Sequence, residues 1–397
     1  MFLLSNMKPA LQILGKLMHP RAAFEHARST MGELKQPQAE GQTPSGLVAY
    51  YGLDSASTPA AIRDISSIGV VLNTQENLPL GRLVNLKLLK AGEAESSAEL
   101  EIPLQAEVAA LEEGGAALKF VLPPSLNPVL WEVLLRNIVN LTDPDQVVEA
   151  LRTLHTALFL CRLCPSGAEE AILLLGGQLD QDRTATLFKI ARAAEDLLAR
   201  EPDGGRMRAH PKLVANILRD GSWAPDELAM QLWVGLFVSS CSVDGPDDSN
   251  QILVDLLVHI TATEAGILTH ACERALRSAP GPANSASASI VLTPDEIVKL
   301  TGIHDLTRNA TDLAYLFNLG LIQKVFDFSS YVDMDSFDIT PSTLGLELYK
   351  HCHGARGRID PQLVEAAKEH LAVFLPPPIP SVFENITPLE PDSPPKS

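Results

Sequence analysis

The clearest pattern in the chain is an alternation of apolar and polar residues with a period of two between residues 47 and 122. Residues 100–108, "LEIPLQAEV", place Leu, Ile, Leu, Ala and Val on one face and Glu, Pro, Gln and Glu on the other, as a half-buried strand does. Residues 84–88 and 117–121 alternate as well. Pro103 predicts an edge or a bulge, because proline cannot donate a hydrogen bond to a neighbouring strand. Glycines stand where turns are needed, at Gly81, Gly114 and Gly115. The pattern therefore predicts a small antiparallel β-barrel.

After the barrel the apolar residues recur every three to four positions, which is the period of α-helices. Asp143, Pro144 and Gln146 have the arrangement of an N-cap, a first-turn proline and an N3 partner. They open a long helix that we expect to run through Leu163. Residues 261–264 form another capping box. Further helices are predicted over 166–179, 180–200, 209–220, 225–241, 249–259 and 262–279. This part of the chain is predicted to be an all-α bundle.

A second helical region follows a linker of small residues and prolines. Residues 293–296 combine a capping box with a proline in the first helical turn. We expect a helix from there to a turn at Gly302, and a second helix over 307–319. Two short runs then predict a β-hairpin, and a closing helix covers 341–353. Helix, helix, hairpin and helix together are the outline of a winged-helix module.

These patterns describe an α+β multidomain protein with seven segments. They are an N-terminal helix, a linker, a β-barrel, a helical bundle, a second linker, a winged-helix-like module with a closing helix, and a proline-rich tail. The corresponding residues are 1–29, 30–46, 47–125, 126–279, 280–289, 290–373 and 374–397. We expect the weakly amphipathic N-terminal helix to pack on the protein, with contact to a membrane or a partner as the alternative. The composition of the tail predicts disorder.

The charge and the cysteines narrow the class of protein. The chain has 49 acidic and 31 basic residues and a net charge of −18, which argues against nucleic acid as a partner because polyanions would be repelled. Five cysteines without disulfide-framework spacing indicate a reducing compartment. No run reaches the roughly 18 apolar residues of a membrane span, and the first residues lack the apolar core of a signal peptide. We therefore expect a cytoplasmic protein without a transmembrane segment.

A short motif inside the predicted barrel is the main candidate for ligand chemistry. Within residues 62–72, "IRDISSIGVVL", the spacing of Asp64, Ser66 and Gly69 is Asp-x-Ser-x-x-Gly. With the strands around it, this region resembles the PilZ domain, a six-stranded bacterial barrel that typically binds cyclic di-GMP. The resemblance implies a carboxylate that accepts guanine N–H groups, a hydroxyl, and a glycine that permits close backbone approach. The candidate nucleotide-binding residues are therefore Arg63, Asp64, Ser66 and Gly69.

The second half of the family's ligand site is missing. PilZ domains grip their ligand with an Arg-x-x-x-Arg stretch just before the first strand. Between Ser29 and Ile62 the only basic residue is Lys35, while Arg21 and Arg28 stand earlier and seven residues apart. Charge-assisted hydrogen bonds contribute about 1.5–3 kcal/mol each. Without the two arginines, the phosphates of cyclic di-GMP would meet an acidic protein with little compensation.

A structural role for the motif is therefore favoured over a retained nucleotide site, which stays as the alternative. Asp64 and Ser66 can cap a strand-end turn through side-chain to backbone hydrogen bonds. Gly69 can serve a positive φ or a tight corner. Arg63 can pair with a neighbouring carboxylate. In this reading the barrel binds no cofactor, and cyclic di-GMP is the ligand to test.

The helical part carries a second resemblance. It rests on three stretches of the sequence. They are residues 210–240, "HPKLVANILRDGSWAPDELAMQLWVGLFVSS", residues 259–273, "HITATEAGILTHACE", and the two ends of residues 316–352. In these stretches the region 205–353 resembles the abortive-infection alpha family of bacterial proteins, with two residues inserted after Pro341. The resemblance implies a phage-defence or stress role and brings no catalytic residues with it.

Several residues of this region are expected to serve packing. Trp233, Leu236 and Phe237 fall on one helical face, so they are predicted to lie in the core. Gly320 is placed to follow the end of a helix. Gly345 lies inside the closing helix, where it allows another segment to approach closely.

The winged-helix-like module is a poor candidate for DNA binding. Residues 290–353 contain nine acidic and four basic residues, a net charge of −5, whereas a DNA-reading module needs a basic surface. The candidate reading helix offers only Arg308 and Asn309 at its start. We expect this module to dock a protein or to pack against the bundle.

No recognisable catalytic motif is present in the sequence. Cys161 and Cys164 with His155 would make three ligands of a zinc site, but structural zinc needs four, and buried cysteines are favoured. The sequence therefore predicts a non-enzymatic bacterial regulatory or phage-defence protein that acts through protein partners, with a homo-oligomer left open. The alternatives are a cyclic di-GMP receptor that signals to the helical region and a winged-helix transcription regulator.

Overall fold

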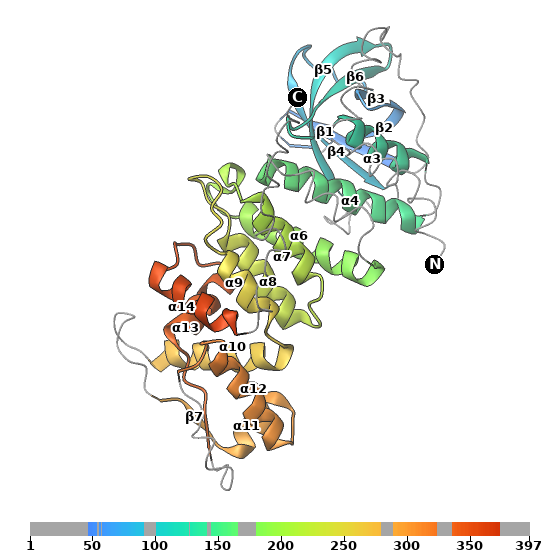
Figure 1. The fold of residues 1–397 in the computed structure, drawn as a ribbon. Helices are drawn as coiled ribbons and strands as arrows, with labels where there is room; N and C mark the ends of the chain where they lie inside the picture. Colours follow the sequence, from blue (N-terminus) through green and yellow to red (C-terminus); the bar gives the residue numbers. More distant parts are fainter. Residues whose placement is uncertain are drawn as a thin grey trace, which may run out of the picture.

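A computed structural model describes the chain from Leu47 to Val373 with several gaps (Figure 1). The gaps are residues 54, 57, 91–100, 127, 141–143, 166–179, 279–288 and 324–335. Five of the predicted segments fall wholly or almost wholly outside the described residues. They are the N-terminal helix at 1–29, the linkers at 30–46 and 280–289, the helix at 166–179 and the tail at 374–397.

The first described domain is a closed six-stranded antiparallel barrel, which confirms the predicted fold of this region. Its strands are β1 (Leu47–Gly52), β2 (Thr58–Ile65), β3 (Gly69–Asn73), β4 (Leu83–Lys90), β5 (Ile102–Glu112) and β6 (Gly115–Val121). They follow one another around the barrel in the order β1-β2-β3-β6-β5-β4. Because β1 also pairs with β4, the sheet closes on itself, and each of the six strands has a neighbour on both sides.

Strand β5 shows why the alternating pattern predicted this barrel. From Ile102 to Val108 its residues are buried and exposed in strict alternation, so every second side chain fills the interior. Pro103 lies where β5 pairs with β4 alone, because the pairing with β6 begins at Gln105. The predicted edge strand is therefore wrong, because β5 has a neighbouring strand on each side, and the proline is tolerated where β6 does not reach.

Two helices lie directly below the barrel and connect it to the rest of the chain (Figure 1). They are α3 (Pro128–Asn140) and α4 (Pro144–Leu163). Trp131 of α3 is 1% exposed, and its ring meets that of Phe120 on β6 edge-to-face at 5.4 Å between centroids. The core of the barrel thus continues into the first helices, and the predicted start of α4 at Pro144 is correct.

The central part is the predicted helical bundle, built around α8. Its elements are α6 (Gln181–Ala199), the 3₁₀ turn η2 (Gly204–Arg206), α7 (Pro211–Gly221), α8 (Glu227–Ser239), α9 (Gln251–Val258) and α10 (Ala262–Ser278). Each helix agrees with its predicted range to within about two residues at either end. Trp233, Leu236 and Phe237 are buried, as predicted. The capping box at the start of α10 is present, with the Thr261 N–H donating to Glu264 Oε2 at 2.7 Å.

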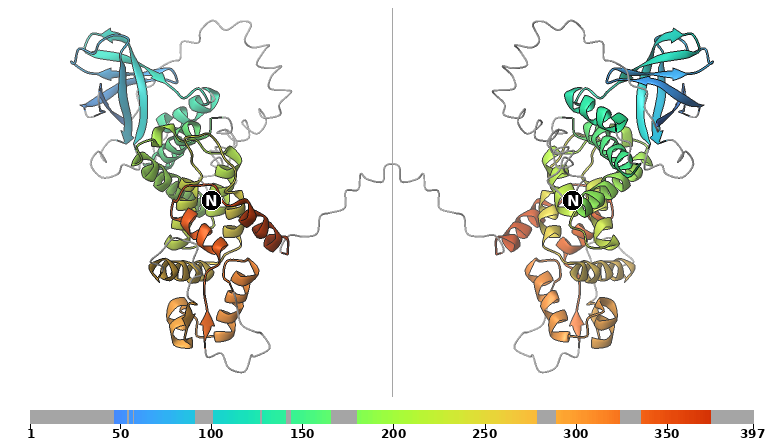
Figure 2. Two further views of the ribbon diagram at one scale, coloured as in Figure 1. Left: turned by 90° about the vertical axis from the view of Figure 1, so that its left-hand side faces the viewer. Right: turned by 90° about the vertical axis from the view of Figure 1, so that its right-hand side faces the viewer.

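The C-terminal part contains β7 (Val291–Leu292), α11 (Pro294–Thr301), α12 (Leu306–Asn318), β8 (Phe337–Asp338), α13 (Thr343–Cys352) and α14 (Pro361–Ala372). Two side views place α11 and α12 at the opposite end of the molecule from the barrel (Figure 2). Strand β8 pairs with β7, and Ile322 forms an isolated bridge with Pro341. The remainder of the predicted hairpin, 324–335, lies outside the described residues.

The closing helices fold back onto the bundle. Helix α13 packs against α8 and α14 against α9. A Cβ atom on Gly235 of α8 would lie 1.7 Å from the Cys352 carbonyl oxygen, and one on Gly345 of α13 would lie 2.1 Å from the Leu321 carbonyl oxygen. Glycine is required at both positions because any side chain would collide with backbone. Gly320 follows α12 with a φ of 71°, as predicted for a helix end.

Candidate functional site

The Asp-x-Ser-x-x-Gly motif forms the turn between β2 and β3. The Ser66 backbone N–H donates to the Gly69 carbonyl oxygen at 2.9 Å. The Ser66 hydroxyl accepts from the Ile68 N–H at 3.3 Å and donates to the Gly69 carbonyl oxygen at 3.4 Å. This hydroxyl therefore closes its own turn, in the manner expected of a serine at such a position.

Gly69 is required by a close approach of two strands. A Cβ atom at this position would lie 2.2 Å from the carbonyl oxygen of Leu118 on β6. Its φ is not positive, since the described glycines with positive φ are at other positions. The positive φ considered for Gly69 is therefore wrong, and the close approach of β6 is what requires glycine here.

Arg63 and Asp64 lie at an irregularity in the pairing of β2 with β3. The register shifts between Ile62 and Asp64, as at a β-bulge. The Arg63 guanidinium forms an ion pair with Glu112, and both side chains are about two-fifths exposed, at 43% and 41%. Asp64 is half-buried, and its Oδ1 atom is buried without a hydrogen-bond partner among the described residues.

The same turn is attached to the helical region. The Trp131 indole N–H donates to the Ser67 carbonyl oxygen at 2.7 Å. The carbonyl oxygen of Ile68 accepts from the Phe120 N–H at 2.9 Å. The motif is therefore the place where the β2–β3 turn, β6 and α3 meet, and the structure brings the four candidate residues together within this corner of the barrel.

A second site joins the barrel to the bundle, and sequence reasoning missed it. We call it the junction cluster: His155 and Arg162 of α4, Arg192 and Glu195 of α6, and the carbonyl oxygen of Glu101 just before β5. His155 Nδ1 lies 2.5 Å from that carbonyl oxygen, and His155 Nε2 lies 2.5 Å from Glu195 Oε2. Arg192 Nη1 lies 2.7 Å from His155 Nε2. Arg162 Nη2 lies 3.3 Å from Glu195 Oε1.

The junction cluster holds an ionised carboxylate out of water. Glu195 is 9% exposed, and burial by itself raises the pKa of its carboxyl group. The hydrogen bond and charge of His155, together with the charges of Arg162 and Arg192, outweigh burial and lower that pKa. No local pattern indicates this site, because its members belong to three segments whose helical or strand periodicity says nothing about which neighbour they meet.

The three residues considered as zinc ligands have other roles. Cys161 and Cys164 are buried, and Cys164 donates its S–H to the Leu160 carbonyl oxygen at 3.2 Å. Burial, assisted by the neighbouring Cys161, raises the pKa of Cys164 to about 12, so this thiol is protonated at neutral pH. Both ring nitrogens of His155 belong to the junction cluster. Among the residues that the structure describes, no group of three or more His, Cys, Asp or Glu is arranged to hold a metal ion.

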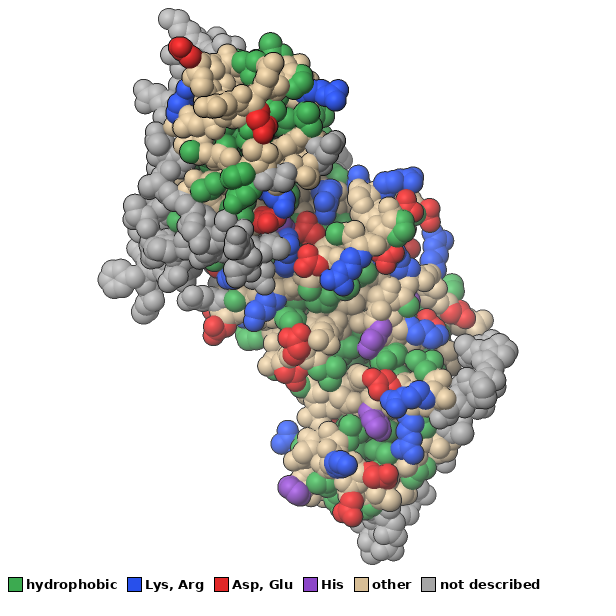
Figure 3. All heavy atoms as spheres, turned by 180° about the vertical axis from the view of Figure 1, so that it is seen from behind, with side chains coloured by type: hydrophobic (Ala, Val, Ile, Leu, Met, Phe, Trp, Pro, Cys, Tyr) green, Lys and Arg blue, Asp and Glu red, His purple; other side chains and the backbone are tan. Residues whose placement is uncertain are grey.

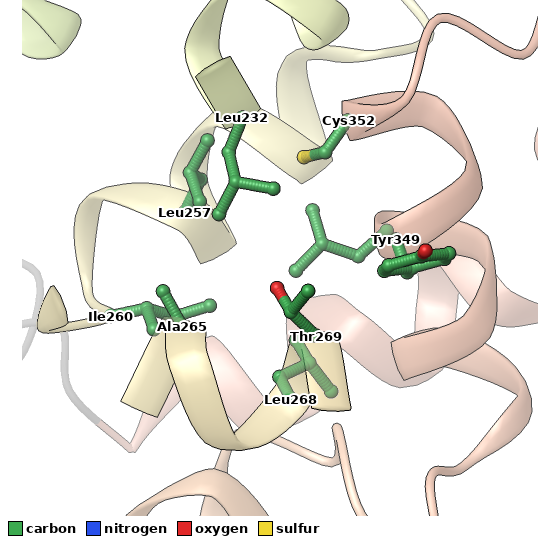
Figure 4. Close-up of a pocket in the computed structure, with 9 residues that line it drawn as sticks. Leu232, Leu257, Ile260, Ala265, Leu268, Thr269, Tyr349 and Cys352 are labelled. Carbon is green, nitrogen blue, oxygen red and sulfur yellow. The ribbon is translucent and has the colours of Figure 1, made fainter. Parts of the chain in front are cut away.

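An apolar pocket lies between α8, α9, α10 and α13 (Figure 4). Its lining is mostly aliphatic, and three polar side chains reach it, those of Thr269, Tyr349 and Cys352. Burial raises the pKa of the Cys352 thiol above the ordinary range of cysteine. The pocket has the composition of a packing gap between helices and lacks the convergent polar groups of a ligand site.

The candidate DNA-reading residues of the C-terminal part do not form a reading face. Asn309 is fully buried, and its Nδ2 donates to the Ile303 carbonyl oxygen at 2.9 Å. Arg308 lies in the first turn of α12, whose N-cap is Asp305. On the face shown in Figure 3, acidic and basic side chains are interspersed over the helical region. A buried asparagine cannot contact a base, so of the two candidates only Arg308 could reach nucleic acid.

An exposed aromatic side chain lies at the turn between α7 and α8. Trp223 is 66% exposed, and the Arg183 guanidinium carbon lies 3.9 Å from the centroid of its ring. Arg183 Nε and Nη2 donate to the Ser222 hydroxyl at 3.1 and 3.0 Å. The stack is thus held in place by hydrogen bonds from the guanidinium edge, while the indole stays open to contact.

Comparisons with known proteins leave the family of this chain open. No family model matches the sequence, and neither the curated proteins nor the solved structures contain a match. In the described part of the chain, no helix is long and apolar enough to cross a membrane.

Proposed function

We propose that this chain is a non-enzymatic bacterial regulatory or phage-defence protein that acts in the cytoplasm through protein–protein contacts. In this proposal the barrel is a degenerate PilZ-like domain, and the C-terminal part is a winged-helix-like module that docks or packs rather than reads DNA. Two features of the barrel support the proposal. The Ser66 hydroxyl is used within its own turn, and the Arg63 guanidinium is paired with Glu112.

The observation that carries the proposal is the stack of Arg183 on Trp223. Tryptophan and arginine are the residue types that contribute most to binding at protein interfaces. A stack that is already formed loses little conformational entropy when a partner binds. An indole that is 66% exposed and immobilised by its neighbour has the properties of such a binding residue.

The charge of Arg183 indicates the chemistry of the partner. Within the described part of the chain, its guanidinium bonds to neutral oxygens, those of the Ser222 hydroxyl and the Arg219 carbonyl group. Arg219, by contrast, is paired with Asp220 at 2.8 Å. Among the described residues no carboxylate pairs with Arg183. A partner that places a carboxylate at the guanidinium edge and an apolar side chain on the indole would complement this surface.

Site-specific photo-crosslinking tests the proposal. A photoreactive phenylalanine analogue replaces Trp223 in the full chain, which is expressed in bacterial cells and irradiated. We expect one crosslinked partner, whose yield falls at least tenfold when Arg183→Glu is added. The matched control places the analogue at Leu276, an exposed residue of α10, where no such crosslink is expected. Equal crosslinking at both positions would contradict the proposal.

A buried oxygen atom of Asp64 favours a second candidate function. Asp64 Oδ1 is buried and has no hydrogen-bond partner among the described residues, and such an oxygen is stabilised when a donor reaches it. A guanine N–H group of cyclic di-GMP could be that donor. The barrel would then be a cyclic di-GMP receptor that signals to the helical region.

Calorimetric titration with cyclic di-GMP separates the two candidates. For a protein that works through protein contacts we expect no binding at micromolar concentrations, because two arginines of the family's site are absent. Titration at micromolar affinity that is lost in Asp64→Ala and retained in Glu76→Ala would instead establish the receptor function. Glu76 is an exposed carboxylate of the same barrel.

A further inference from the structure

A single nitrogen of the junction cluster has two competing contacts. His155 Nε2 lies 2.5 Å from the carboxylate oxygen Oε2 of Glu195 and 2.7 Å from the guanidinium nitrogen Nη1 of Arg192. The carboxylate can only accept a hydrogen bond, and the guanidinium can only donate one. With a proton on Nε2 the imidazole can bond to Glu195, and without it the imidazole can bond to Arg192. It cannot do both.

The other ring nitrogen keeps its proton in both states. His155 Nδ1 lies 2.5 Å from the backbone carbonyl oxygen of Glu101, which can only accept. The neutral ring is therefore the Nδ1–H tautomer, with the lone pair on Nε2 directed at Arg192 and Glu195. The bond between α4 and the barrel persists in both states, and the change on protonation falls on the contacts with α6.

The charges around His155 are balanced when the ring is neutral. Three cations face it or its partners: Arg162 from α4, Arg192 from α6, and Lys87 of β4 through Glu101. Three carboxylates balance these cations: Glu195 contacts His155 itself, Glu101 pairs with Lys87, and Asp196 pairs with Arg192. A proton on His155 leaves the cluster with one excess positive charge in a site where the imidazole is only 6% exposed. Such a charge is unfavourable unless a neighbouring cation moves away.

Arg192 is the cation that can move. Its side chain is 25% exposed, and its Nε lies 3.4 Å from Asp196 Oδ1 at the surface of α6. Arg162 bonds to the opposite oxygen of Glu195, Oε1. A second donor on Nε2 would face Arg192 Nη1 at 2.7 Å, so the guanidinium would turn outward toward Asp196 and solvent.

We propose that the Nε2 proton of His155 is a switch that decides whether Arg192 is held inside the barrel–helix junction or released toward Asp196 and solvent. Histidine is the side chain that ordinarily changes its charge between pH 5 and 8, which makes pH the signal to test. The output is a change in the exposed charge of α6 beside the barrel. The switch operates whether or not the proposed protein partner exists, because all its parts belong to this chain.

Nitrogen NMR of the full chain with ¹⁵N-labelled histidine tests the proposal. We expect the Nδ1 of His155 to keep the shift of a protonated nitrogen from pH 5 to pH 8, while Nε2 changes from protonated to unprotonated in that interval. His155→Asn assigns the signal. His304→Asn, at an exposed histidine of the α11–α12 turn, leaves the His155 signals in place.

Substitutions at the two residues that contact Nε2 should change its protonation in opposite directions. Arg192→Gln removes the competing cation and should favour the protonated Nε2, and Glu195→Gln removes the acceptor and should favour the unprotonated Nε2. The measurements on Arg192→Gln and Glu195→Gln do not require that the His155→Asn variant folds. The proposal is overturned by a neutral ring with its proton on Nε2, by a ring that stays charged or neutral throughout pH 5 to 8, or by shifts of the same sign in the two variants.

Discussion

The two sites of this molecule satisfy their polar groups in opposite ways. The β2–β3 turn, with Ser66 and Gly69, uses short-range hydrogen bonds to its own backbone and one indole N–H from Trp131. The junction cluster uses charged side chains from helices far apart in the sequence, with Glu195 and His155 both buried. The turn has a recognisable motif and little charge inside, whereas the cluster has no motif and holds buried ions. The presence of a motif therefore did not indicate where the charged groups of this protein converge.

The largest expected effect is at the base of the turn. Trp131→Ala removes a side chain that is 1% exposed together with its hydrogen bond to Ser67. We expect the free energy of unfolding to fall by about 3–5 kcal/mol, as for other large aromatic residues in cores. Urea unfolding followed by circular dichroism measures it. Trp223→Ala, at an exposed tryptophan, is the control and should change the value by less than about 0.5 kcal/mol. Equal losses in both variants would show that Trp131 does not join the barrel to α3.

The junction cluster should give the next largest effect and a dependence on pH. Glu195→Gln removes the carboxylate that His155, Arg162 and Arg192 surround. We expect a loss of about 1.5–3 kcal/mol at pH 7. Because the folded state lowers the pKa of Glu195, its stabilisation is complete above the ordinary pKa of a glutamate and is lost as the pH falls through the folded value.

Urea unfolding at pH 7, 5 and 4 checks this prediction. The difference between wild type and Glu195→Gln should be smaller at pH 4 than at pH 5 or pH 7. Glu132→Gln is the matched control, since it breaks an exposed Glu132–Arg136 pair and should change stability by less than about 1 kcal/mol. A Glu195→Gln protein as stable as wild type at pH 7 would mean that desolvation cancels the attraction in the cluster.

The hydroxyl of the turn should give a smaller effect. Ser66→Ala removes the acceptor for the Ile68 N–H and the donor to the Gly69 carbonyl oxygen. We expect a loss of about 1 kcal/mol, the typical net value for neutral hydrogen bonds in proteins. Ser67→Ala changes the neighbouring side chain outside these hydrogen bonds and serves as the control in the same unfolding measurement. If Ser67→Ala cost as much as Ser66→Ala, the hydroxyl would not be what closes the turn.

The smallest effect should come from the surface ion pair of the motif. Arg63→Ala breaks the pair with Glu112, in which both side chains are about two-fifths exposed, at 43% and 41%. We expect a change below about 1 kcal/mol that shrinks further in high salt, because solvent and ions screen such pairs. Thermal unfolding in low and high salt measures it. A large loss that persists in high salt would mean that the Arg63–Glu112 pair contributes as much to stability as the junction cluster does.

Most of the fold followed from local patterns, and part of the motif's role did as well. Alternation predicted β5, and capping residues predicted the starts of α4, α10 and α11. The role of Ser66 as a turn cap is a local property and could be anticipated. The reason for Gly69 could not, because the carbonyl oxygen that excludes a side chain belongs to Leu118 on β6, 49 positions away in the sequence. The burial of Asn309 was missed because its position in the first turns of α12 suggested an exposed residue.

The sequence by itself determined the order of the barrel and helices, their approximate bounds and their caps, because these depend on periodicity and on hydrogen bonds within a few residues. The junction cluster was decided only by the tertiary structure. His155 meets a carbonyl oxygen 54 positions away and a carboxylate 40 positions away, and no local interaction selects those partners. They come together because α4 packs against β5 as well as against α6. Burial then removes the water that would otherwise separate their charges.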